Sequence, residues 1–107
     1  MKIKYAAPLI ALVVNCISFD PLDKTTDRAI KIARLAERTG ASGYCFSPEK
    51  ELCPVEMDYI NQKVIKETSL EFRVYEADDG VRDYCVMRRN DLSKKLERRG
   101  KDYRRIF

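Results

Sequence analysis

The sequence contains no histidine and no tryptophan. Without histidine there is no Ser-His-Asp or Cys-His nucleophile pair, no imidazole metal ligand and no histidine acid or base. Four cysteines are present, but no two of them have the two-residue separation that is typical of zinc sites. The sequence therefore predicts no metal site and identifies no cofactor. Any catalysis would have to use carboxylates, tyrosine, lysine or cysteine.

The chain also lacks internal repeats and low-complexity segments. Its 107 residues are 45% hydrophobic and 36% charged, with a formal net charge of +4. These proportions are typical of a soluble globular protein, and the length suits one hydrophobic core. We therefore expect a single domain over residues 1–107.

Only one long apolar run occurs, over residues 6–18, and it has two interpretations. Its β-branched residues without alternation favour a strand that is covered on both faces, in a cytoplasmic protein. Alternatively, Lys2 and Lys4 precede an apolar stretch of suitable length with Ser18 at a tolerable cleavage position, which is typical of an export signal. The alternative is thus a cleaved signal over residues 1–18 of an exported, periplasmic or secreted protein. The run falls short of the roughly 20 apolar residues of a membrane span, so none is predicted.

The first half of the chain predicts a strand, a helix and a second strand. Thr25 and Thr26 offer caps for a helix whose apolar face includes Ala29 and Ala33, and Gly40 supplies its left-handed stop. A short strand is expected over residues 41–47. A strand–helix–strand unit implies parallel pairing with a right-handed connection. We therefore expect an α/β fold, a small three-layer domain with a parallel βαβ centre.

The second half predicts a further helix, a hairpin and a last helix. Pro54 suits the first position of a helix that ends at Thr68. Alternation from Leu70 predicts a strand, the turn 78–80 contains glycine, and the chain returns over residues 81–88. A basic helix with a tail is expected over residues 88–107. The predicted domain is thus completed by a C-terminal antiparallel hairpin and this basic helix.

Polar side chains gather where the predicted strands end and the first helix begins. Asn15 and Ser18 follow the apolar run, Asp23 and Thr26 open the helix, and Ser47 ends the second strand. Ligands of open α/β sheets bind beyond the carboxyl ends of strands, and helix N-termini bind anions. These five residues are the predicted ligand-binding site. No Gly-rich loop or Walker lysine accompanies them, and ordinary helix capping is the alternative explanation.

This arrangement resembles an uncharacterised bacterial and phage α/β domain family. That family has Asn-Pro-Ser at a strand end and then Asp-x-x-Thr at a helix start. Here Asn15, Asp23 and Thr26 match that pattern, the second strand ends at Ser47, and Cys16 stands where the family has proline. The resemblance covers about the first half of the chain. It implies an α/β fold and carries no settled activity.

The last twenty residues are strongly basic. Residues 88–107 contain nine lysines and arginines against three acidic residues. Such asymmetry predicts binding to a phosphate backbone, with a solvated surface or an acidic protein partner as alternatives. The predicted nucleic-acid-binding residues are Arg98, Arg99, Lys101, Arg104 and Arg105.

The predicted hairpin is rich in carboxylates, at Glu71, Glu76, Asp78, Asp79 and Asp83. Two carboxylates held close together can divide acid and base roles or bind a divalent cation. The alternative is an ordinary solvated turn.

The cysteines have two interpretations. Free buried thiols are expected. The alternative is a bridge between Cys45 and Cys53, which would require an oxidising compartment.

Together these patterns predict a small binding module for an anionic ligand, with a nucleotide or nucleic acid favoured. The alternative is an exported bacterial or phage protein that acts by protein–protein binding, such as an immunity or exclusion factor. The sequence leaves open whether the protein is an enzyme.

Overall fold

The computed structural model describes residues 19–48 and 50–107. The predicted first strand, the alternative export signal and two predicted site residues, Asn15 and Ser18, lie outside the described residues.

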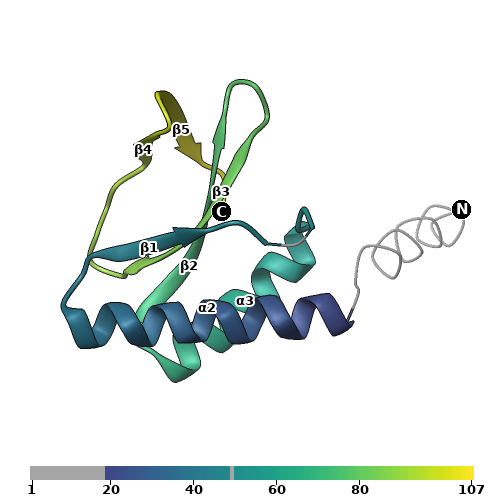
Figure 1. The fold of residues 1–107 in the computed structure, drawn as a ribbon, viewed down its shortest axis with the longest axis vertical. Helices are drawn as coiled ribbons and strands as arrows, with labels where there is room; N and C mark the ends of the chain where they lie inside the picture. Colours follow the sequence, from purple (N-terminus) through teal and green to yellow (C-terminus); the bar gives the residue numbers. More distant parts are fainter. Residues whose placement is uncertain (1–18, 49) are drawn as a thin grey trace, which may run out of the picture.

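Two helices and five strands follow one another in this part of the chain (Figure 1). The helices are α2 (Phe19–Thr39) and α3 (Pro54–Glu67), and β1 (Gly43–Phe46) lies between them in sequence. The remaining strands are β2 (Leu70–Ala77), β3 (Arg82–Arg88), β4 (Lys95–Arg98) and β5 (Lys101–Arg105).

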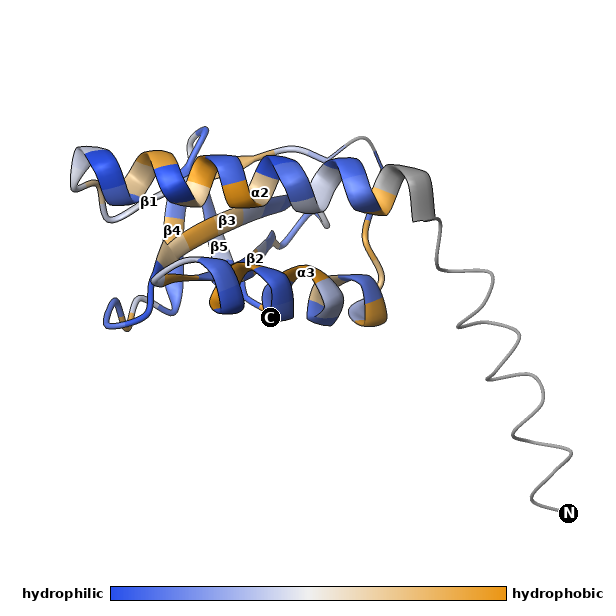
Figure 2. Ribbon diagram, turned by 90° about the horizontal axis from the view of Figure 1, so that it is seen from below, coloured by the Kyte–Doolittle hydropathy of each residue, from blue (hydrophilic) through white to orange (hydrophobic). Residues whose placement is uncertain are grey.

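The five strands form one antiparallel sheet in the order β1-β3-β2-β5-β4. The sheet curls into a half-barrel, with α2 and α3 together on one face (Figures 1 and 2). The predicted parallel three-layer α/β fold is therefore wrong. The predicted second strand exists as β1, but it pairs antiparallel with β3, with Cys45 opposite Cys85. The predicted antiparallel hairpin exists as β2–β3, and its two strands lie between β1 and β5 in the sheet.

Helix α2 ends where the sequence predicts but begins earlier. Ala29, Ala33 and Ala36 have no exposed surface and form the face that packs on the core. Gly40 follows with a φ of 73°, the left-handed geometry that terminates helices. The helix starts at Phe19 rather than at the predicted caps, which lie inside it.

Helix α3 begins at Pro54, as predicted. The Glu56 carboxylate accepts a hydrogen bond of 3.1 Å from the backbone N–H of Cys53, which occupies one of the free donors at the helix start. Thr68 ends the helix, and its hydroxyl donates to the Val64 carbonyl at 2.8 Å. This short connection leads directly into β2.

Alternation along the central strands separates two apolar layers. Phe72, Val74, Tyr84 and Val86 face the helices and form the main core with α2 and α3. On the other, concave face lies a smaller cluster of buried residues: Tyr75, Ala77, Cys85, Met87 and Tyr103. Since both faces of β2 and β3 are covered, these strands are almost wholly buried.

The predicted basic C-terminal helix does not form. Residues 90–94 are irregular, and β4 and β5 make a hairpin whose turn has positive φ at Arg99 and Gly100. The spacing of Leu92 and Leu96 suggested one helical face. However, Leu92 is 83% exposed, whereas Leu96 packs against the concave cluster as part of β4.

A disulfide joins Cys45 of β1 to Cys85 of β3, across paired positions with a Cα–Cα distance of 3.9 Å. Cys53 is also disulfide-bonded. None of the cysteines in the described residues is a free thiol. Both expectations, buried free thiols and a Cys45–Cys53 bridge, are therefore wrong for Cys45, because its partner is Cys85.

Candidate functional site

The described part of the predicted anion site is not a helix N-terminus. Because α2 begins at Phe19, Asp23 and Thr26 lie within its first turns. Thr26 is buried, and its hydroxyl donates to the Leu22 carbonyl at 2.7 Å. Ser47 is exposed after β1, and its carbonyl accepts a hydrogen bond of 2.8 Å from Arg28. Ser47 thus lies close to α2. The part of α2 beside it is not a helix N-terminus with free backbone N–H groups.

The predicted nucleic-acid-binding residues are each paired with a carboxylate. On the β4–β5 hairpin, Lys101 lies 2.6 Å from Asp79, and Arg104 lies 3.1 Å from Asp78. Arg105 lies 3.8 Å from Glu71. The remaining two, Arg98 and Arg99, lie 3.2 Å and 3.7 Å from the same residue, Asp83. The acidic hairpin β2–β3 therefore offsets part of the positive charge of the hairpin β4–β5, and Lys95 of β4 makes no ion pair among the described residues.

Asp83 is the buried member of these pairs. It has no exposed surface, and neither carboxylate oxygen makes a hydrogen bond within the described residues. Its interaction with the two arginines is therefore electrostatic. A buried carboxylate is costly without a cation nearby, so we assign Asp83 to holding the β4–β5 hairpin against β3.

The Lys101–Asp79 pair shifts both ionisations. The hydrogen bond from Lys101 holds the pKa of Asp79 below its usual range, and the same bond raises the pKa of Lys101. Both residues stay charged at neutral pH and cancel each other at the surface.

The carboxylates that the sequence predicted as a possible acid–base or cation site also form ion pairs. Glu76 lies 2.8 Å from Arg82, and Glu71 lies 2.6 Å from Arg73. Within the described residues, no group of three or more possible ligand side chains is placed to hold a metal ion. These carboxylates have structural partners rather than the open geometry of a cation site.

Cations without acidic partners gather instead on the outward side of α2. Lys24, Arg28, Lys31, Leu35 and Arg38 follow one another at intervals of three or four residues, and all are exposed. We call these five residues the outward row. Among the described residues, none of its four cations makes an ion pair.

Helical geometry explains why these residues share a face. At 3.6 residues per turn, steps of three and four keep side chains on one side of a helix. The buried alanines occupy the other side. From Lys24 to Arg38 the outward row extends for about 21 Å, at 1.5 Å per residue.

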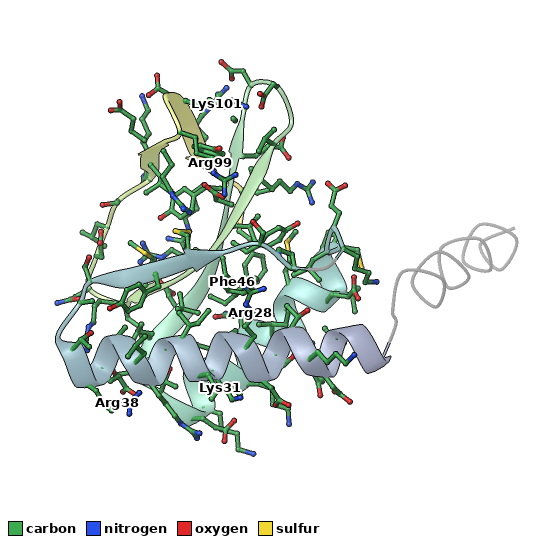
Figure 3. The ribbon with its side chains drawn as sticks, viewed as in Figure 1. Arg28, Lys31, Arg38, Phe46, Arg99 and Lys101 are labelled. Atoms are coloured by element: carbon green, nitrogen blue, oxygen red, sulfur yellow. A yellow bond between two sulfur atoms is a disulfide. The ribbon has the colours of Figure 1, made fainter. Side chains whose placement is uncertain are left out.

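Figure 3 shows Lys31 and Arg38 along the outer side of α2, far from Arg99 and Lys101 on the β4–β5 hairpin. Arg28 reaches back toward the sheet, where its guanidinium lies 5.4 Å from the centre of the Phe46 ring. A shallow hollow of about 500 Å³ lies over this face, lined by Lys31, Ile32, Arg34, Leu35 and Arg38. Leu35 is 39% exposed there. The outward row therefore offers positive charge around one exposed apolar side chain.

The sequence predicted part of the outward row. Lys31 and Arg38 fall outside the apolar face of the predicted helix. The sequence did not reveal that, among the described residues, carboxylates pair with five of the C-terminal cations and with none of the cations in the outward row.

A comparison with protein-family models, curated proteins and solved structures finds no match to this chain. Across residues 19–48 and 50–107, neither helix combines the length and hydrophobicity needed to cross a bilayer. Function is therefore inferred from the residues of this chain alone.

Proposed function

We propose that this protein is exported and acts by binding a partner protein through the outward row of α2. This is the protein–protein alternative of the sequence. The observation that carries it is an unequal pairing of charge. Five cations of the β4–β5 hairpin have carboxylate partners, whereas the four cations of the outward row have none among the described residues. The five that are paired are Arg98, Arg99, Lys101, Arg104 and Arg105.

The cysteines support an oxidising compartment. Cys45 and Cys85 form a disulfide. Disulfides persist outside the cytosol and are rare within it. Residues 1–18 would then be the export signal that their composition suggests. Their removal would leave three cysteines, so the argument for an oxidising compartment rests on the Cys45–Cys85 bridge.

The shape of the surface favours a macromolecule over a small ligand. Small-molecule sites are usually concave and bury most of the ligand. The outward row lies along a single convex helix, and its hollow is lined by residues of that helix alone. An extended partner surface can contact several of these side chains at once: Lys24, Lys31, Leu35 and Arg38.

A nucleic acid is the second candidate, because four cations without carboxylate partners along about 21 Å of helix also suit a phosphate backbone. The exposed Leu35 in the middle of the row favours protein, since interface centres are depleted of charge and contain apolar anchors. The disulfide favours protein too, because an oxidising compartment separates the chain from cellular nucleic acid.

Export is tested by the intact mass of the protein from its native host, measured before and after reduction and alkylation. We expect a mature chain that begins at Phe19 and in which Cys45 and Cys85 cannot be alkylated until the protein is reduced. A full-length chain with free thiols would contradict export.

Binding through α2 is tested by a photo-crosslinking residue placed at Leu35 and, as a matched control, at Leu92. Both leucines are exposed, but Leu92 lies far from α2 in sequence, before β4. We expect a discrete protein adduct from position 35 in the native host and none from position 92. Adducts of equal yield from both positions would contradict a specific surface.

A further inference from the structure

We infer that the partner docks an acidic amphipathic helix along α2, with Asp or Glu side chains spaced to match the outward row and an apolar residue over Leu35. The inference rests on the proposed function and specifies the chemistry of the partner.

The spacing of the outward row suits another helix. Successive members are four, three, four and three residues apart, which is the period at which two packed helices meet one another. A partner helix with carboxylates at the same period keeps its charges opposite Lys24, Lys31 and Arg38 over the whole length. An irregular acidic loop would meet only part of the row.

The flanks of the outward row favour an acidic partner. Arg34 already pairs with Glu67 of α3 at 3.4 Å, and Glu37 is engaged by Ser69 through two hydrogen bonds. Asp27 is exposed beside the row and makes no ion pair among the described residues. Asp23 is exposed on α2 as well and likewise makes no ion pair among the described residues. The four cations of the row outnumber these two carboxylates, so the face keeps a net positive charge.

The apolar part of the face is small. Leu35 is 39% exposed, and Ile32 beside it is half-buried and packs against the core. One exposed leucine suits a single anchor in a helix–helix contact. A helix that lies in a lipid interface needs a broad apolar face, and the apolar face of α2 is already occupied by the core. These observations favour a protein helix over a membrane surface.

The test uses the oxidised protein as purified from its host and two synthetic 21-residue peptides of identical composition. One peptide carries five glutamates at the four–three spacing around one leucine, and the other distributes the same residues evenly around the helix. A 20-base-pair DNA duplex and anionic phosphatidylserine vesicles are the additional probes. Affinity is measured by fluorescence anisotropy, or by cosedimentation for vesicles, at 50 mM and 500 mM salt.

Two charge-reversal variants of the chain accompany the measurement. The test variant is Lys24→Glu/Lys31→Glu/Arg38→Glu. The matched control is Lys63→Glu/Lys94→Glu/Lys95→Glu, which reverses three exposed cations on α3 and before and in β4. Both variants change the net charge equally, so a general charge effect would act on both.

We expect the spaced peptide to bind at least tenfold more tightly than the distributed peptide at 50 mM salt. Binding should weaken at least tenfold at 500 mM salt, because screening shortens the range of charge interactions. It should also weaken at least tenfold in the test variant and less than threefold in the control.

Equal binding of the two peptides, or equal loss in the two variants, would overturn the inference. Tighter binding of the DNA duplex or the vesicles, lost in the test variant, would overturn the choice of a protein helix. If no probe binds while position 35 still gives a protein adduct in the host, the acidic-helix inference fails but the proposed function stands.

Discussion

Arg73 shows how one buried cation organises the concave face of the sheet. It is 1% exposed, and its guanidinium donates to Glu71, to the Tyr75 hydroxyl and to the carbonyls of Arg88 and Asp91. A planar group with several donors in fixed directions suits these partners, whereas an ammonium does not. Arg73 therefore fixes the segment that follows β3.

We expect Arg73→Lys to lower the free energy of unfolding by about 2 kcal/mol, because hydrogen bonds to a charged buried group are lost and their partners stay buried. Arg104→Lys is the control, since Arg104 and its partner Asp78 are 74% and 91% exposed. It should cost less than about 0.5 kcal/mol. Denaturant titration measures both, and equal costs would show that Arg73 has no special role.

Gly43 allows β1 to approach β3 closely. A Cβ at this position would lie 3.0 Å from the Met87 Cα and closer still to the Val86 carbonyl and the Met87 sulfur. We expect Gly43→Ala to destabilise the protein by about 1–3 kcal/mol through overpacking, measured by thermal or denaturant unfolding. Ser42→Ala, at the exposed neighbour, should change stability by less than about 0.5 kcal/mol. A neutral Gly43→Ala would show that the two strands can move apart freely.

Glu37 links α2 to the start of β2 and gives the fold a pH dependence. The Ser69 hydroxyl and backbone N–H donate to its carboxylate at 2.7 Å and 2.9 Å, which lowers the pKa of Glu37 below its ordinary value of 4.5. A lowered pKa means that this contribution to stability is present above pH 4.5 and is lost as the pH falls through the folded-state pKa.

We expect Ser69→Ala to move the pKa of Glu37 up toward 4.5, because the hydroxyl bond is the largest cause of the shift. The carboxyl carbon of Glu37, followed by NMR as the pH is lowered, reports it directly. An unchanged titration midpoint would contradict the proposed bond.

Several elements were predictable from the sequence because their signals are local. The Gly40 stop of α2, the Pro54 start of α3 and the β2–β3 turn with Gly80 at a φ of 85° all agree with it. The pairing of β1 was not predictable, since a four-residue strand carries no mark of its partner or direction. The prediction of a helix in the segment 90–100 was wrong because leucines at positions 92 and 96 fit a helix as well as they fit a loop and a strand.

The Cys45–Cys85 disulfide secures β1 at the edge of the sheet. It closes a loop with a sequence separation of 40 residues. We expect Cys45→Val/Cys85→Val to cost about 2–4 kcal/mol of stability, because the unfolded chain regains the entropy of that loop. Valine pairs suit neighbouring strands, so the sheet should still form.

Hydrogen exchange distinguishes a local effect of this double substitution from a global one. Amides of β1 should lose more protection than those at the centre of β2. Unchanged stability together with unchanged β1 protection would show that the disulfide does not stabilise the fold. The disulfide would then no longer support an oxidising compartment.

For the molecule as a whole, charge is divided between two regions. Carboxylates of the hairpin β2–β3 pair with most cations of the hairpin β4–β5, whereas the cations of the outward row of α2 have no carboxylate partner among the described residues. The sequence showed the basic C-terminus correctly as composition. It could not show the pairing, because the partners come from residues far apart in the chain. The candidate site is therefore on α2 rather than at the C-terminus. From the sequence, the cations of α2 could be recognised only as the polar side of a helix.

The most direct measurement of the central claim is NMR shift mapping of the ¹⁵N-labelled chain during titration with the spaced acidic peptide. We expect amide and side-chain signals of Lys24, Lys31, Leu35 and Arg38 to shift together and to saturate. Signals of Arg98, Lys101 and Arg104 should stay in place, because their charges are already paired. Shifts confined to the β4–β5 hairpin, with the outward row unaffected, would contradict the account.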